Sequence, residues 1–173
     1  MEVKPVESHP KLQSQPIFNL GLLQEILGDL LSQGEYTIYL LFRVGVSTPL
    51  TLDTIMALRP KHFLEKEENF QFYLFGELPN EIYNFLKSQP REKKLFSEIA
   101  HQALREKLIG YGIQDFDRET LRKTFGYHYF QKTKDIRKVE KVLDMKPETF
   151  TFKYIGYFDE TYYCFYCTKG CLW

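Results

Sequence analysis

The stretch ETLRKTFGYH, residues 119–128, and the two segments that follow it decide the fold of this 173-residue chain. Apolar residues recur here at helical spacing, which predicts a helix from Asp117 or Glu119 to Phe130. A second helix is predicted over 135–143. A third begins at Pro147, where proline suits the first helical turn, and runs through Tyr154. The C-terminal half is therefore expected to consist of short helices.

The segments before residue 119 continue this helical pattern with one interruption. Apolar residues three and four apart predict helices over 17–34, 51–58 and 95–108, and Pro79 opens another. The apolar stretch 37–46 lies between helical segments and favours a buried helix over a strand. Residues 62–75 instead alternate around three apolar positions, with the turn at residues 67–69, which predicts a hairpin. The expected fold is mainly α with a small antiparallel β-hairpin or three-stranded sheet.

Composition excludes the disordered and membrane-spanning classes. The chain is 43% hydrophobic and 16% aromatic, whereas disordered chains are poor in aromatic residues. Its longest apolar run, residues 38–42, is far shorter than the roughly 18–20 residues that span a bilayer. Residues 1–16 carry prolines and acids but no apolar segment typical of a secretory signal. We expect a cytoplasmic protein with a flexible tail over 1–16, a domain over 17–157 and an aromatic, cysteine-rich tail over 158–173.

Charge is balanced over the whole chain but unevenly distributed along it. There are 23 basic and 23 acidic residues, so the net charge is zero. Residues 119–146 nevertheless contain eight basic side chains against four acids. A basic face on a neutral protein can contact phosphates. The alternative interpretation, a solvated helix surface, fits the charge equally well.

The three cysteines lie together at the end of the chain, as Cys164, Cys167 and Cys171. This spacing offers three thiolates, but a tetrahedral zinc site needs a fourth ligand. His128 could supply one only if the fold brought it there. We therefore expect a reduced tail and no metal.

Two separated motifs resemble the catalytic domain of the tyrosine recombinases, the phage-integrase family. In that family an H-x-L-R-x-T-F segment is followed, 26 residues after its His, by a second His or Trp and, nine residues later, by a nucleophilic Tyr. The corresponding positions here are Glu119, Met145 and Tyr154. Upstream, residues 45–58 (GVSTPLTLDTIMAL) run in register with the family's T-G-L-R-x-S-[DE]-L-L-x-L helix. The resemblance covers residues 17–157 and implies a tyrosine-recombinase catalytic-like domain that acts on double-stranded DNA without a cofactor.

The resemblance assigns each family role to one position. Tyr154 holds the nucleophile position and Arg122 that of the second phosphate-binding arginine. Lys66, placed by hairpin length alone, would be the lysine that protonates the leaving oxygen. The first arginine and the two histidine positions carry Thr51, Glu119 and Met145 instead.

These departures decide against efficient strand cleavage. Losing one preorganised transition-state donor costs about 10²–10³ in rate, and an acid at position 119 would also repel a phosphate. We therefore expect a recombinase fold in which Arg122, Tyr154 and Lys66 are vestigial. Each also has a purely structural interpretation: Tyr154 as a packing residue, Arg122 as the partner of Glu119 one helical turn away, and Lys66 as a solvated turn residue.

Three functions remain consistent with the sequence. The first is a DNA-binding regulator or accessory factor of phage or mobile-element origin in a bacterium. It would touch phosphates through a basic set comprising Arg122, Lys123, Lys134, Arg137 and Lys138. The second is a residual or partner-assisted strand transferase that uses Tyr154. The third is a protein-interaction module that pairs with an intact recombinase or with itself, which the zero net charge and the aromatic C-terminus favour.

Overall fold

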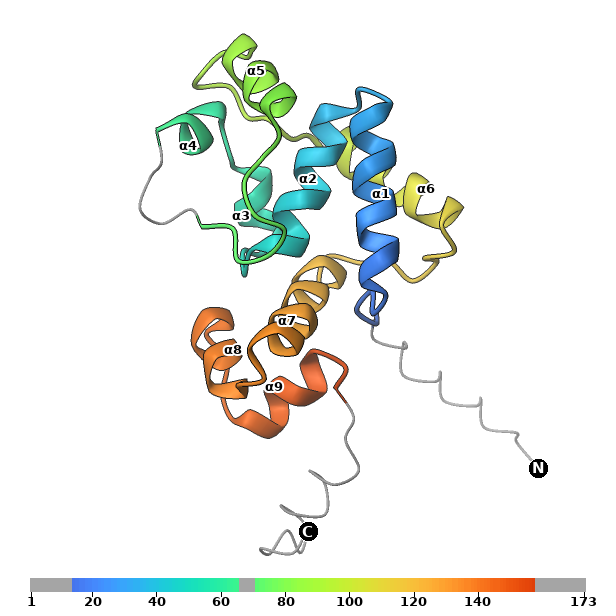
Figure 1. Ribbon diagram of the computed structural model, residues 1–173, viewed down its shortest axis with the longest axis vertical. Coiled ribbons are helices and arrows are strands. Elements are labelled where there is room, and N and C mark those ends of the chain that lie inside the picture. Colours follow the sequence, from blue (N-terminus) through green and yellow to red (C-terminus); the bar gives the residue numbers. More distant parts are fainter. Residues whose placement is uncertain (1–13, 66–70, 158–173) are drawn as a thin grey trace, which may run out of the picture.

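The structure is a computed structural model that describes residues 14–65 and 71–157 (Figure 1). The helices of the described residues are α1 (Leu20–Ser32), α2 (Tyr36–Ser47), α3 (Leu52–Met56), α4 (Pro60–Leu64), α5 (Asn80–Ser88), α6 (Glu98–Gly110), α7 (Thr120–Thr133), α8 (Ile136–Leu143) and α9 (Glu148–Tyr154). None of these helices is long and apolar enough to cross a bilayer. Residues 1–13 and 158–173, which hold most of both predicted tails and all three cysteines, lie outside the described residues.

Helix α2 forms the centre of the larger hydrophobic core. Every side chain from Tyr39 to Ser47 is buried, and α2 packs against α1, α6 and α7. A helix that is apolar all round is stable only when neighbours cover all of its faces. The prediction of a buried helix over 37–46 is therefore confirmed.

Helices α7, α8 and α9 pack on one another below α2 in Figure 1 and form a second core around Phe125. Helix α7 joins the two cores, because Leu121 belongs to the first and Phe125 to the second. Glycines set both contacts. A Cβ on Gly45 would lie 2.5 Å from Leu121 Cδ1, and a Cβ on Gly126 would lie 2.7 Å from Ile155 Cγ2.

The predicted antiparallel hairpin or three-stranded sheet over 62–75 is wrong, since the described residues contain no strand. Residues Pro60–Leu64 form α4, and residues 71–79 run as an irregular segment. Phe75 adopts a left-handed backbone conformation (φ 65°), which interrupts the strand pattern. Other groups pair the backbone that a partner strand would otherwise pair: the Tyr73 N–H donates to the carbonyl of Ser47, and Lys132 Nζ donates to the carbonyl of Tyr73.

Arg43 of α2 pairs two of the carbonyls in this segment. It is 2% exposed and donates to the carbonyl oxygens of Leu74 (2.9 Å) and Gly76 (2.8 Å). The Arg43 guanidinium also lies about 5 Å from the ring centroids of two phenylalanines of the same segment, Phe72 and Phe75. Phe72 and Phe75 thus pack around one buried cation.

Candidate functional site

The fold brings the start of α7 to the end of α9. Glu119 immediately precedes α7, and its Oε2 accepts a hydrogen bond of 2.6 Å from the hydroxyl of Tyr154, the last residue of α9. Burial raises the pKa of Tyr154, the Glu119 carboxylate raises it further, and Arg122 opposes the shift with a smaller effect. The hydroxyl is therefore protonated at neutral pH.

Arg122 is held between two backbone carbonyls. Its Nε donates to the carbonyl of Pro49 (2.9 Å) and its Nη2 to the carbonyl of Leu143 (2.8 Å). These bonds tie α7 to the α2–α3 connection and to the end of α8. Both of these hydrogen bonds from Arg122 go to carbonyl oxygens and not to Glu119.

Thr51 immediately precedes α3 and lies two residues after Pro49, whose carbonyl Arg122 contacts. Its exposed hydroxyl caps α3 by accepting from the Thr54 N–H (3.3 Å) and also bonds the Thr54 hydroxyl (2.9 Å). The position that carries the family's first arginine thus supplies a helix cap. It brings no charge to the site.

Lys123 points into the protein. It is 6% exposed, and its Nζ donates to the carbonyl of Ser14 (2.9 Å). The same ammonium lies 5.6 Å from the ring centroid of Tyr154. Lys123 therefore adjoins Tyr154 but is covered by the segment that contains Ser14.

The other basic residues of the predicted set lie on the outside of α8 and at the end of α7. Ile136, Val139 and Leu143 face the core, which leaves Arg137 and Lys138 in solvent. Their ion pairs are long: 3.4 Å from Arg137 to Glu148, and 3.9 Å from Lys138 to Asp135. Exposed pairs of this kind contribute little, so both cations stay open to another anion.

Lys134 completes this surface. It ends α7 in a left-handed conformation (φ 54°) and is exposed, and its Nζ donates to the side chain of Gln131 (2.7 Å). We call Lys134, Arg137 and Lys138 the α8 basic surface.

The remaining predicted positions take no part in this arrangement. Met145 is partly buried against the second core, and His128 is buried with its Nε2 2.8 Å from the carbonyl of Ile17. Lys66 lies outside the described residues, as do the three cysteines. Among the residues that are described, no cluster of His, Cys, Asp or Glu is suited to hold a metal.

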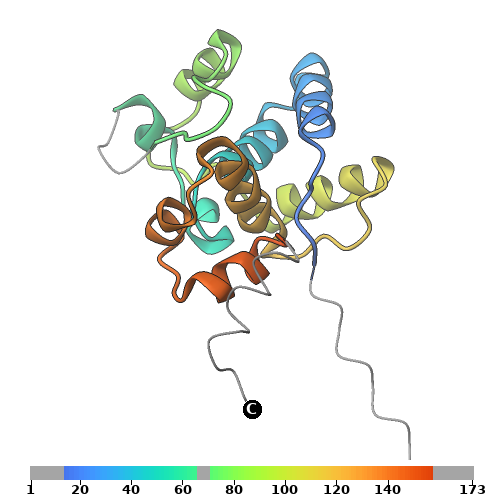
Figure 2. The ribbon, with the colours of Figure 1, turned by 60° about the horizontal axis from the view of Figure 1, so that its bottom comes forward.

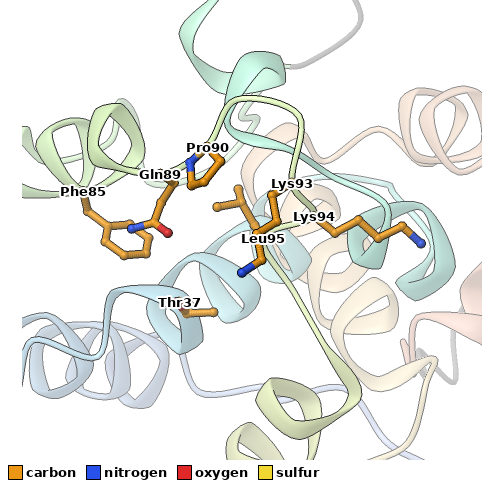
Figure 3. A pocket seen from close by; sticks show the side chains of 7 residues that line it. All are labelled: Thr37, Phe85, Gln89, Pro90, Lys93, Lys94 and Leu95. Carbon is orange, nitrogen blue, oxygen red and sulfur yellow. The ribbon is translucent and has the colours of Figure 1, made fainter.

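A separate small pocket lies at the other end of α2. Its lining comes from α2, α5 and the α5–α6 connection (Figure 3), and consists of Thr37, Phe85, Gln89, Pro90, Lys93, Lys94 and Leu95. Thr37 lies in the first turn of α2, and Pro49, whose carbonyl accepts from Arg122, follows the other end, so nearly the whole length of this 12-residue helix, about 18 Å, separates the pocket from Arg122. It is distinct from the Tyr154 site.

Sequence reasoning missed the roles of Arg43 and of residues 14–19. In the sequence Arg43 only ends an apolar run, although a charge inside an otherwise buried helix is itself a sign of specific buried contacts. Nothing in the sequence of residues 14–19 indicates that they dock on α7.

Comparison with known proteins relates the chain to integrases and recombinases. It is 29% identical over 167 residues to the Bacillus subtilis (strain 168) protein described as "Probable integrase/recombinase YoeC", in an alignment that covers 85% of this chain and 92% of that protein. No family model matches the chain, and no solved structure matches it significantly. The similarity supports an integrase/recombinase relationship, in line with the two motifs.

Proposed function

We propose that this recombinase-like chain binds double-stranded DNA through phosphate contacts and does not cleave it. It would act as a regulator or accessory factor of phage or mobile-element origin. Similarity over nearly the full length of a probable integrase/recombinase supports the DNA partner. The geometry around Tyr154 supports the loss of cleavage.

The hydrogen bond from Tyr154 to Glu119 is the observation that carries this proposal. A tyrosine attacks a phosphate as the phenolate, and its ordinary pKa of about 10 already opposes ionisation. A carboxylate acceptor 2.6 Å away opposes ionisation further and repels an incoming phosphate. Arg122 is bonded to two carbonyls, and Thr51 replaces a cation, so little remains to stabilise the transition state.

The α8 basic surface, together with the half-buried Arg122, is the proposed phosphate-contacting face. Lys134, Arg137 and Lys138 are exposed and held by single hydrogen bonds or long ion pairs. Each lysine or arginine that neutralises a phosphate releases counterions, so binding should weaken steeply with salt. Lys123 is covered and does not belong to this face.

Duplex binding by paired variants tests this face. Arg137→Ala with Lys138→Ala should weaken binding to a random 30-mer duplex and reduce the slope of log affinity against log salt by about two, since each phosphate contact contributes about one. Lys87→Ala with Arg105→Ala removes the same charge from exposed positions on α5 and α6 and is the matched control. Equal slopes for the two double variants would remove the α8 basic surface from the proposal.

Residual or partner-assisted strand transfer is the second candidate. The closeness of Tyr154, Glu119, Arg122 and Lys123 favours it, because a partner protein that displaced Glu119 would leave a tyrosine beside two cations. In this interpretation Lys66 keeps its predicted role as proton donor. A nicked suicide duplex tests it: a covalent protein–DNA adduct that Tyr154→Phe abolishes would favour this function over the non-cleaving one.

A further inference from the structure

Residues 14–19, here called the strap, are held on α7 through their backbone. The Ile17 N–H donates to Thr124 Oγ1 (2.9 Å), and His128 Nε2 donates to the Ile17 carbonyl (2.8 Å). Lys123 Nζ donates to the carbonyl of Ser14 (2.9 Å). All three α7 side chains are buried, so together they form a built site for an extended segment of backbone.

The strap also touches the end of α9. Phe18 packs edge-on against Tyr127 of α7, with ring centroids 4.9 Å apart. A Cβ on Gly156 would lie 3.0 Å from Pro16 and 3.1 Å from Phe18 Cζ. Figure 2 shows the strap leaving α1 and running past the end of α9. The strap therefore covers the side of α7 that adjoins Tyr154.

This arrangement determines what Lys123 can contact. Its ammonium is hydrogen-bonded to a neutral carbonyl and lies against the Tyr154 ring. Burying an ammonium is unfavourable unless its donors are satisfied, and the strap supplies the acceptor. If the strap leaves, the cation loses this acceptor and becomes available to an anion beside Tyr154 and Arg122.

We propose that the strap is an autoinhibitory cover: docked, it masks Lys123, and released, it exposes Lys123 as an additional phosphate contact. This inference rests on the proposed DNA binding. Release of the strap would strengthen DNA binding by adding one cation at the position nearest Tyr154. The chain would thus have a weaker, strap-docked state and a tighter, strap-released state.

Thr124→Val releases the strap most selectively, because it removes the acceptor of the Ile17 N–H with almost no change of shape. Hydrogen exchange at the Ile17 amide should become about tenfold faster. The salt slope of duplex binding should steepen by about one, with tighter binding at 50 mM salt. Thr124→Ser keeps the hydroxyl and should behave as wild type. Thr151→Val makes the same substitution at a buried site on α9 away from the strap and is the matched control.

Two more variants identify Lys123 as the source of the gain. Thr124→Val with Lys123→Gln should release the strap without steepening the slope. Phe18→Ala, at a half-exposed side chain, loosens the strap without altering the buried face of α7 and should reproduce the Thr124→Val gain.

Unchanged hydrogen exchange at the Ile17 amide in Thr124→Val would overturn the proposal. So would a released strap with an unchanged salt slope of duplex binding, or a gain in DNA affinity that persists when Lys123→Gln is added. If wild-type DNA binding depends on the α8 basic surface and any of these results is also found, the strap inference is wrong while the proposed function stands. Absence of DNA binding by every variant would defeat the proposed function and this inference with it.

Discussion

Gly126 determines how closely α7 approaches α9, and its replacement by alanine tests the packing that positions Tyr154. A Cβ at this position would lie 2.7 Å from Ile155 Cγ2 and 3.0 Å from Leu143 Cδ1. Both neighbours are almost fully buried, so neither can move aside freely. Ile155 follows Tyr154 in the chain, and the Leu143 carbonyl accepts from Arg122. Strain here would therefore act on the site itself.

The expected change in the free energy of unfolding of Gly126→Ala follows from two opposing effects. Replacing glycine by alanine inside a helix contributes about 1 kcal/mol of stability, and overpacking a buried contact costs about 1–3 kcal/mol. Gly28 provides the matched control, because it lies in α1 and a Cβ added there would meet no neighbouring group within 4 Å. Gly28→Ala should therefore gain about 1 kcal/mol, while Gly126→Ala should range from neutral to about 2 kcal/mol less stable.

Urea unfolding of the two variants and the wild type measures this difference. Because the propensity gain cancels between the variants, the difference of about 1–3 kcal/mol isolates the contact of α7 with α8 and α9. For a chain of this length it corresponds to about 2–12 °C in melting temperature. Equal stabilisation by Gly126→Ala and Gly28→Ala would refute the close packing of α7 on α9.

Three further predictions concern charged and titrating groups. Glu119→Gln should lower the pKa of Tyr154 but leave it above the ordinary value for tyrosine, because burial persists. A tyrosinate absorbance titration measures this pKa, with the Tyr154→Phe variant titrated in parallel to subtract the other tyrosines, and an unchanged pKa would contradict the prediction. Burial lowers the pKa of His128 below 6.5, so the unfolded state binds the imidazole proton more readily than the folded state does. The stability that is present above pH 6.5 is therefore lost as the pH falls through the lowered pKa. His128→Gln should flatten that loss in urea midpoints measured between pH 7.5 and 5.5, leaving the part due to His101, whose pKa burial also lowers. Arg43→Lys should cost about 2–4 kcal/mol in urea unfolding, because a single Nζ cannot reach all the acceptors that Nη1 and Nη2 contact from two separate positions; a loss below about 1 kcal/mol would contradict it.

Helices such as α1 and α6 were predictable because their apolar residues repeat with the helical period, whereas α4 overlaps the predicted hairpin and was missed. The apolar stretch 37–46 became a helix for a reason that the sequence carries, namely its position between amphipathic segments. The hairpin was not predictable in the same way, because the alternation around Phe72 reflects packing around the Arg43 guanidinium, which comes from a distant helix. Local periodicity does not register such a contact.

The candidate site was also predictable only in part. The resemblance to the recombinase motifs singled out Glu119, Arg122 and Tyr154, and the structure places them at one point where α7, α8 and α9 meet. Charge patterning also selected the exposed residues Arg137 and Lys138. The burial of Lys123 was not accessible, because it depends on a segment more than a hundred residues earlier in the chain.

Fluorescence anisotropy of the wild-type protein with a random 30-mer duplex, titrated at 50 and 200 mM salt, tests whether the chain binds DNA through phosphate contacts. With four phosphate contacts, from Arg122 and the α8 basic surface, affinity should fall about 10²-fold between the two salt concentrations. Absence of binding at 50 mM salt would contradict the proposed DNA binding and would favour a role in protein interaction.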